Sequence, residues 1–151
     1  MLDRHWIAAH IPHQGAMCLL EKVENWSHEH VYCRTTRHRD ISNPMRATGR
    51  LGAACGIEFA AQAMALHGAL IATQQDATPF PQPKAGLLVS VRQVQFNVAR
   101  LDDIEDDLQV EVTRLSGNTH NVMYDFQLRD ETRVLITGRA TVILDTEITG
   151  K

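Results

Sequence analysis

The feature that most constrains the fold is one long, alanine-rich stretch, residues 53–73, set among segments with strand periodicity. Alanine is the strongest helix former, and Ile57, Ala61, Met64 and Gly68 recur at helical spacing on one face. The other faces are also mostly Ala, Phe and Leu, so we expect this helix to be buried nearly all round. A chain with one such helix needs a sheet that can enclose it.

The residues after the helix alternate between apolar and polar, as half-buried strands do. Strands are expected at residues 87–98, 110–113, 122–128 and 134–144. The apolar phase slips in the first of them, which predicts a bulge at Arg92 and Gln93. Turn residues at 116–118 and 129–131 separate hairpin partners, so an antiparallel meander is expected.

Two shorter strands are expected before the helix, at residues 17–26 and 30–36, with a turn near Ser27. Residues 74–84 hold three of the five prolines and are expected to form a loop, too short to separate two domains. The fold class predicted for residues 1–151 is therefore a single α+β domain, an antiparallel sheet wrapped around one helix.

Composition excludes several functional classes. The net charge of −3 and the pI near 6.2 argue against a nucleic-acid binder. The helical stretch is interrupted by Glu58, Gln62 and His67, and the N-terminal residues lack a long apolar core, so neither a membrane span nor a secretory signal is expected. Three cysteines at irregular spacing form neither a disulfide framework nor a zinc pattern, which favours a reducing cytoplasm.

No metal or other cofactor is expected. The acidic run at residues 102–107 lacks the glycine and the terminal glutamate of a calcium-binding EF-hand loop. We expect it to form a solvated turn.

Glu58 and Gln62 are polar residues inside the apolar helix, and their spacing of four places them on one face. A carboxylate buried without a partner has a raised pKa, which would suit it to general acid catalysis. The alternative is that Glu58 lies at an exposed rim near the helix start, where the helix dipole favours a carboxylate.

His13 is the histidine best placed for proton transfer, because it stands between Pro12 and a glycine-containing turn at a strand entrance. The others have simpler explanations. His67 lies late in the helix, where a cation suits the dipole. An exposed N-terminal turn is expected to hold His5 and His10, and solvated turns or strand ends to hold His28, His30, His38 and His120.

Two segments carry a family resemblance. Residues 12–23 read PHQGAMCLLEKV and resemble the PHRxPxLLVDRV entrance of the 3-hydroxyacyl-acyl-carrier-protein dehydratases, the FabZ/FabA-like superfamily. Residues 58–62 read EFAAQ and resemble the ExxAQ motif of the same superfamily. That superfamily has the hotdog fold, a sheet wrapped around one long helix.

One departure from this pattern matters. The common bacterial dehydratases carry their catalytic histidine in a GHFPxxPxxPG segment before the helix, whereas residues 43–52 here read NPMRATGRLG. The chain looks closer to the ApeP-like dehydratases of aryl-polyene biosynthesis, which share a PHxGxM entrance and a GIExxAQ helix. Residues 56–62 read GIEFAAQ, and His13 is left as the candidate for the missing imidazole.

The resemblance implies dehydration of a 3-hydroxyacyl thioester in fatty-acid or polyene-type synthesis. We expect His13 to be the base, and Glu58 to be the acid or to orient the hydroxyl through water. In the substrate site, Gln62 would hold Glu58, backbone N–H groups of Cys55 and Gly56 would polarise the thioester carbonyl, and Gly56 would allow close approach. The resemblance also implies a homodimer in which the two catalytic side chains come from different subunits.

The implied partner is an acyl carrier protein with its phosphopantetheine arm. Such a carrier protein would be acidic. Arginine recognises phosphate and carboxylate well, so the arginines before the helix are candidates for docking it: Arg34, Arg37, Arg39, Arg46 and Arg50. A solvated strand face is the alternative. We expect Cys55 to be a small packing residue, and the alternative is a reactive thiol with a lowered pKa near the helix start.

Two other functions remain open from the sequence. A hotdog thioesterase would use Glu58 to activate water, with His13 structural. A non-catalytic hotdog subunit would need a second chain. The absence of a histidine from residues 43–52 favours this alternative, whereas the presence of both His13 and Glu58 argues against it.

Overall fold

The computed structural model describes residues 2–75, 86–118 and 120–144. The α-helices and strands are, in chain order, α1 (Arg4–His10), β1 (Lys22–Trp26), β2 (His30–Thr35), α2 (Gly56–Gln75), β3 (Gly86–Phe96), β4 (Leu108–Gly117), β5 (Asn121–Arg129) and β6 (Val134–Leu144). Short 3-10 helices lie between them: η1 (Gly15–Met17), η2 (Arg37–Arg39) and η3 (Ala53–Cys55).

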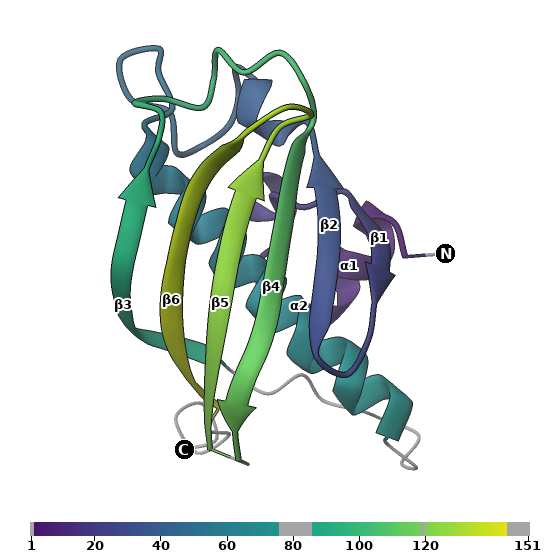
Figure 1. Cartoon of the computed structure of the whole chain (residues 1–151). Coiled ribbons are helices and arrows are strands. Elements are labelled where there is room, and N and C mark those ends of the chain that lie inside the picture. The colour runs from purple at the N-terminus through teal and green to yellow at the C-terminus, as the bar shows by residue number, and fades with distance from the viewer. Residues whose placement is uncertain (1, 76–85, 119, 145–151) are drawn as a thin grey trace.

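The strands form one antiparallel sheet of six, in the order β1-β2-β4-β5-β6-β3 (Figure 1). β4, β5 and β6 make the expected meander, while β3, which follows α2, lies at the far edge. The other edge is partly covered by the N-terminal residues, because Asp3 bridges to Lys22 and the amide of Val23 donates to the carbonyl of Leu2 at 3.0 Å. β3 is therefore the more open edge within the described chain.

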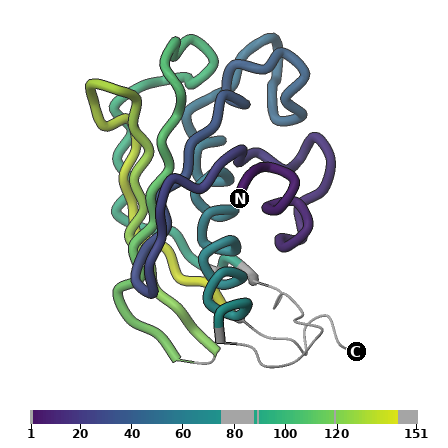
Figure 2. Tube along the Cα trace, turned by 90° about the vertical axis from the view of Figure 1, so that its right-hand side faces the viewer, coloured from purple at the N-terminus to yellow at the C-terminus, as the bar shows by residue number. Residues whose placement is uncertain are grey.

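Helix α2 lies across the concave face of the sheet, and α1 with the segment after it lies on the other side of α2 (Figure 2). This layering explains why the helix is apolar on several faces: Phe59, Ala60 and Leu66 are all fully buried. By length and composition the stretch Ala53–Gln74 could cross a membrane, yet 56% of its apolar window is buried within the protein. The hotdog architecture expected from the sequence is confirmed.

The element boundaries differ from the expectations at three places. The first strand begins at Lys22 rather than at Met17, because Gly15–Met17 form η1 and residues 18–20 are buried beneath it in the core. Gln74 and Gln75 belong to α2, and the rest of the expected proline loop lies outside the described residues. Strand β4 extends to Gly117, so the hairpin turn begins later than expected.

The bulge predicted in β3 is present. Pairing with β6 shifts register between Arg92 and Gln95, and Gln93 has a φ of 57°. A positive φ is uncommon for a non-glycine residue and is typical of a bulge, where one extra residue must be accommodated.

Helix α1 was not predicted from the sequence, and the expectation of a turn for His5 and His10 is wrong. Asp3 caps the helix by accepting a hydrogen bond from the Trp6 amide at 3.0 Å. The His10 ring stacks on Trp6 with centroids 3.8 Å apart, which covers one side of an imidazole expected to be solvated.

Two further histidine expectations are wrong, since His38 and His67 are fully buried. Nε2 of His38 bonds the carbonyls of Ile104 and Asp106 at 3.1 and 3.0 Å. His67 bonds the Tyr124 hydroxyl and the Ser27 carbonyl, both at 2.9 Å, so it joins α2 to the sheet instead of meeting solvent. Burial lowers the pKa of both imidazoles and favours their neutral forms.

Candidate active site

His13 and Glu58 meet beside the first turn of α2. His13 follows α1 on an irregular stretch, whereas Glu58 stands at the third position of α2. Nε2 of His13 lies 3.1 Å from Oε2 of Glu58, and the two side chains are 25% and 33% exposed. The pair is formed within one chain, so the expectation that the two side chains come from different subunits does not describe this contact.

Gln62, one turn after Glu58, is fully buried and hydrogen-bonded at both ends of its amide. Its Oε1 accepts from the Leu19 amide at 2.9 Å, and its Nε2 donates to the Met17 carbonyl at 2.7 Å. Nε2 also donates to Oε2 of Glu58 at 3.2 Å, which is the hydrogen bond expected from the helical spacing. Gln62 thus holds Glu58 as expected, and because its side chain is fully buried it does not itself line the substrate site.

The environment of Glu58 lowers the pKa of its carboxyl group. The largest cause is the hydrogen bond from His13; partial burial opposes it, and the bond from Gln62 adds to it. Glu58 is therefore not the unpartnered buried carboxylate whose pKa would be raised. It is one-third exposed near the helix start, closer to the alternative, and is a carboxylate near neutral pH. Both hydrogen bonds reach Oε2, and the described residues place no donor on Oε1.

The other ring nitrogen of His13 has a different environment. Nδ1 is buried and has no hydrogen-bond partner among the described residues. Since Nε2 faces a carboxylate, the neutral ring carries its proton there and has its lone pair at Nδ1. A buried polar atom without a partner is unusual and is typical of a site kept for a ligand or a reaction.

Cys55 and Gly56 do not have the expected roles. The Cys55 amide donates to the Gly52 carbonyl at 3.0 Å, and the Gly56 amide donates to carbonyls within η3, so neither is free to polarise a substrate carbonyl. A Cβ on Gly56 would lie 2.4 Å from Cδ1 of Ile136 on the sheet. Glycine at this position lets the helix pack closely on the sheet; it does not open a path for substrate.

Most of the five candidate docking arginines already have hydrogen-bond or ion-pair partners within the chain. Arg34 pairs with Glu24 and Glu131 at 3.1 and 3.0 Å, and Arg39 pairs with Asp107 at 3.4 Å. Glu131 and Asp107 come from segments far along the chain, which is why the sequence showed an excess of positive charge around these arginines. Carrier docking stays a prediction for this surface.

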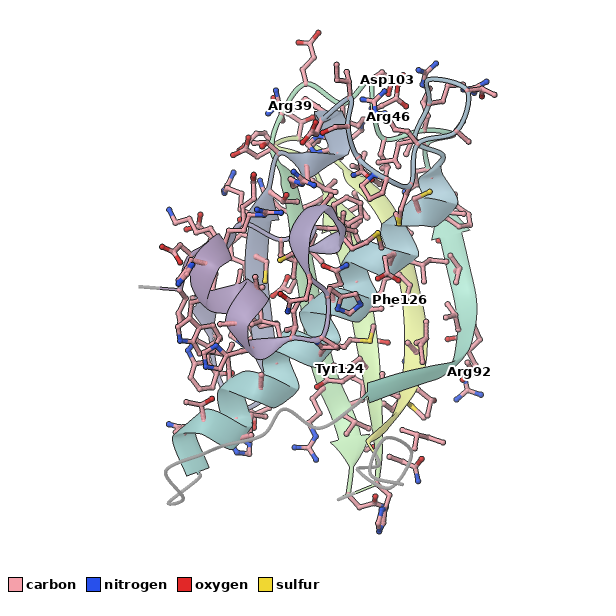
Figure 3. All side chains as sticks on the ribbon, turned by 180° about the vertical axis from the view of Figure 1, so that it is seen from behind. Arg39, Arg46, Arg92, Asp103, Tyr124 and Phe126 are labelled. Carbon is pink, nitrogen blue, oxygen red and sulfur yellow. The ribbon has the colours of Figure 1, made fainter. Side chains whose placement is uncertain are left out.

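The remaining arginines differ from one another. Arg46 donates to three backbone carbonyls, those of Asp40, Gly49 and Arg39. Arg37 has a side chain only 14% exposed, too enclosed for docking. Arg50 is exposed; its backbone pairs with that of Ala47, and its side chain has no hydrogen bond or ion pair with another described residue. Arg39 and Arg46 lie with Asp103 at the end of the molecule where α2 begins, whereas Arg92 lies apart on β3 (Figure 3).

The acidic run is not simply a solvated turn. The side chain of Asp102 is 7% exposed, accepts from the Leu51 amide at 2.9 Å and pairs with Arg100. The Arg100 guanidinium holds the pKa of this carboxyl well below its usual range. Asp102 thus fixes the segment leading into η3. Within residues 2–75, 86–118 and 120–144, no group of three His, Cys, Asp or Glu side chains is placed to hold a metal ion.

Sequence reasoning missed Arg4, whose guanidinium reaches the stretch that carries His13. Its Nη2 donates to the carbonyls of Gly15 and Cys18 at 2.8 and 3.2 Å. The sequence did contain a signal for this helix: Asp3 is a typical helix cap, and Pro12 is a typical residue just after a helix end. Together they would have placed Arg4 on a helix.

Comparison with known proteins identifies the family and the fold. A family model described as ApeP-like, ApeP dehydratase, matches residues 5–149. Comparison with curated proteins gives no match. Among solved structures, the dehydratase heterocomplex ApeI:P from Xenorhabdus doucetiae is similar with a TM-score of 0.83 and 25% identity, covering 95% of each chain.

Two thioesterases share the fold at greater distance. A hypothetical thioesterase with coenzyme A from Streptococcus pneumoniae has a TM-score of 0.58 and 13% identity, covering 82% of this chain and 84% of its own. Thioesterase superfamily member 2 from Mus musculus has a TM-score of 0.55 and 15% identity, covering 82% and 81%. At these identities the likeness concerns the fold alone.

Proposed function

The chain belongs to the ApeP-like dehydratase family, and from this premise we propose that it dehydrates 3-hydroxyacyl thioesters carried on an acyl carrier protein. The product would be the trans-2-enoyl thioester of a fatty-acid or aryl-polyene type pathway in the cytoplasm. The observation that supports this proposal is the contact between His13 and Glu58, which joins an imidazole to an ionised carboxylate beside a helix start.

The pair offers a single route for the proton. Nδ1 is the ring nitrogen of His13 that Glu58 does not hold, and once substrate binding opens access to this buried atom it takes the proton from C2, which makes the ring an imidazolium. Glu58 stabilises that charge through the hydrogen bond to Nε2, and it does not itself donate a proton. The imidazolium then returns the proton to the hydroxyl at C3, which leaves as water while the C2–C3 double bond forms. This keeps His13 as the expected base and replaces the expected acid role of Glu58.

A second subunit is part of the proposal. The Xenorhabdus relative is a dehydratase heterocomplex, and here β3 leaves the more open sheet edge while the N-terminal residues cover part of β1. An unpaired strand edge readily takes up another strand. We expect a second copy to pair there. Light scattering of the purified protein should give twice 16.9 kDa, and a monomeric mass would overturn the expected homodimer.

The testing experiment follows two products in one tube. The purified chain is mixed with a 3-hydroxyacyl carrier-protein thioester, while enoyl absorbance and free thiol are both recorded. Enoyl formation without thiol release is expected, and it should disappear in Glu58→Gln and His13→Gln. Thiol release without enoyl would indicate a thioesterase in which Glu58 activates water. If neither enoyl absorbance nor free thiol increases, and activity appears after a second hotdog subunit is added, the chain would be a non-catalytic partner.

A further inference from the structure

The backbone that carries His13 is held by side chains to an unusual degree. We call residues 13–19 the His13 loop. Five consecutive carbonyls of this loop each accept a hydrogen bond from a side chain outside it: those of Gly15, Ala16, Met17, Cys18 and Leu19. Loop carbonyls usually face water, so this arrangement fixes a segment that would otherwise be mobile.

Two of the four donors are arginines, and they come from different elements. Arg4, on α1, reaches Gly15 and Cys18, whereas Nη2 of Arg37, on η2, donates to the Ala16 carbonyl at 2.8 Å. The other two donors are Thr35, whose hydroxyl donates to the Leu19 carbonyl at 2.6 Å, and Gln62, which also bonds Glu58. The loop is therefore tied both to the two arginines and to the helix that carries its catalytic partner.

Both guanidinium groups are partly removed from water, which costs free energy, and each makes hydrogen bonds to particular carbonyls of the loop. Nε of Arg4 and Nε of Arg37 are buried without a partner among the described residues, and a second nitrogen of Arg37 pairs with Asp40 at 2.9 Å. Burial raises the pKa of the Cys18 thiol, and the charges of Arg4 and Arg37 both oppose that rise. Buried guanidinium groups are retained where they form specific hydrogen bonds.

We propose that Arg4 and Arg37 are positioning residues that hold the His13 loop so that the imidazole stays against Glu58. Neither residue reaches the His13–Glu58 contact itself in the described structure; each acts through the backbone of the loop. Among the described residues, no hydrogen bond fixes the peptide group of His13 directly. Its neighbours hold it instead: the Gln14 side chain donates to the carbonyls of Ala8 and Ile11, and the clamped carbonyls follow. Arg37 thus has this role instead of docking a carrier protein.

This inference rests on the proposed function for its kinetic consequence but not for its structural one. The test compares Arg4→Met and Arg37→Met with Arg129→Met, a matched control. Arg129 also donates to a backbone carbonyl, that of Asp130, but far from the His13 loop. A displacement of about 1 Å can cost about 100-fold in rate, so we expect kcat to fall about 10- to 100-fold in the first two variants and to stay unchanged in the control.

The second readout does not need turnover. Titration of the Glu58 carboxyl by carbon NMR, assigned with Glu58→Gln, reports whether His13 still donates to it. We expect the measured pKa of Glu58 to rise by about 0.5 or more in Arg4→Met and Arg37→Met, since the largest stabilising hydrogen bond is loosened. Arg4→Lys and Arg37→Lys keep a cationic donor and should recover part of kcat and part of the lowered pKa.

The outcomes separate the two proposals. A Glu58 pKa that rises in both methionine variants supports the clamp, even if the chain dehydrates none of the thioesters offered. A Glu58 pKa equal to that of wild type in folded methionine variants overturns the clamp, whatever the activity. If the methionine variants do not fold, the lysine variants decide: a wild-type Glu58 pKa with full kcat in both overturns it too.

Discussion

His13 and Glu58 of the same chain lie 3.1 Å apart, Nε2 to Oε2. Each chain therefore holds a complete imidazole–carboxylate pair, and a dimer would contain two such pairs, neither divided between subunits. The carboxylate receives hydrogen bonds from His13 and Gln62 on one oxygen, which makes it the fixed member of the pair.

Mixed dimers test this arrangement. Chains carrying His13→Ala and chains carrying Glu58→Ala, co-expressed with two different affinity tags, should give purified mixed dimers without activity, because each subunit lacks one member of its own pair. If the two side chains came from different subunits, one of the two sites in a mixed dimer would be intact. Dehydration at about half the wild-type rate per dimer would then be measured, against our expectation.

Replacing Glu58 with Gln should remove activity and leave the fold intact. The isosteric amide cannot stabilise an imidazolium, and catalytic proton-transfer groups typically contribute about 100- to 10,000-fold. The side chain is one-third exposed, so unfolding in urea should change little. A variant with near wild-type kcat would exclude Glu58 from the mechanism.

Gln62→Leu should be destabilising because it leaves the amide of the fully buried Leu19 without its acceptor. An unsatisfied buried donor costs about 1–3 kcal/mol, and the free energy of unfolding from urea titration should fall by that amount. Gln127→Leu, on a half-buried position of β5, serves as the control, with an expected change of about 0.5 kcal/mol or less. Equal effects of the two substitutions would contradict a special role for Gln62.

Stability should fall as the pH drops below about 6.5, the ordinary pKa of an unfolded histidine. His67 and His38 are buried with lowered pKa values, so between the folded and unfolded pKa the unfolded chain binds more protons. Their contribution is complete above that pH and is lost on acidification. His67→Gln should show a weaker decline of unfolding free energy between about pH 7 and 5 than wild type, whereas exposed His120→Gln should match wild type.

Two glycines should respond to alanine in opposite directions. A Cβ on Gly138 would meet the Phe126 ring at 2.5 Å, so Gly138→Ala should destabilise by about 1–3 kcal/mol. A Cβ on Gly68, within α2, meets nothing within 4 Å, so Gly68→Ala should stabilise by about 0.5–1 kcal/mol. Thermal melting checks both, and a loss of stability in Gly68→Ala would show that another subunit covers that helix surface.

The sequence alone determined the architecture, because local periodicity is written residue by residue. Alanine at helical spacing specified α2, alternation specified the meander, and a slip in that alternation located the bulge at Gln93. The two motifs also singled out His13 and Glu58 before their contact was known. Helix α1 escaped prediction because a seven-residue helix carries little periodic signal and relies on its Asp3 cap.

Only the tertiary structure decided the electrostatics of the site. Glu58 was expected to be a general acid, yet its pKa depends on a hydrogen bond from His13, a residue distant in sequence. The ion pairs of Arg34 and Arg39 also depend on acidic residues from other segments. Likewise, the amides of Cys55 and Gly56 are unavailable to a substrate because they donate hydrogen bonds at η3. Charge, burial and hydrogen bonding act through space, so they are settled only when distant segments are brought together.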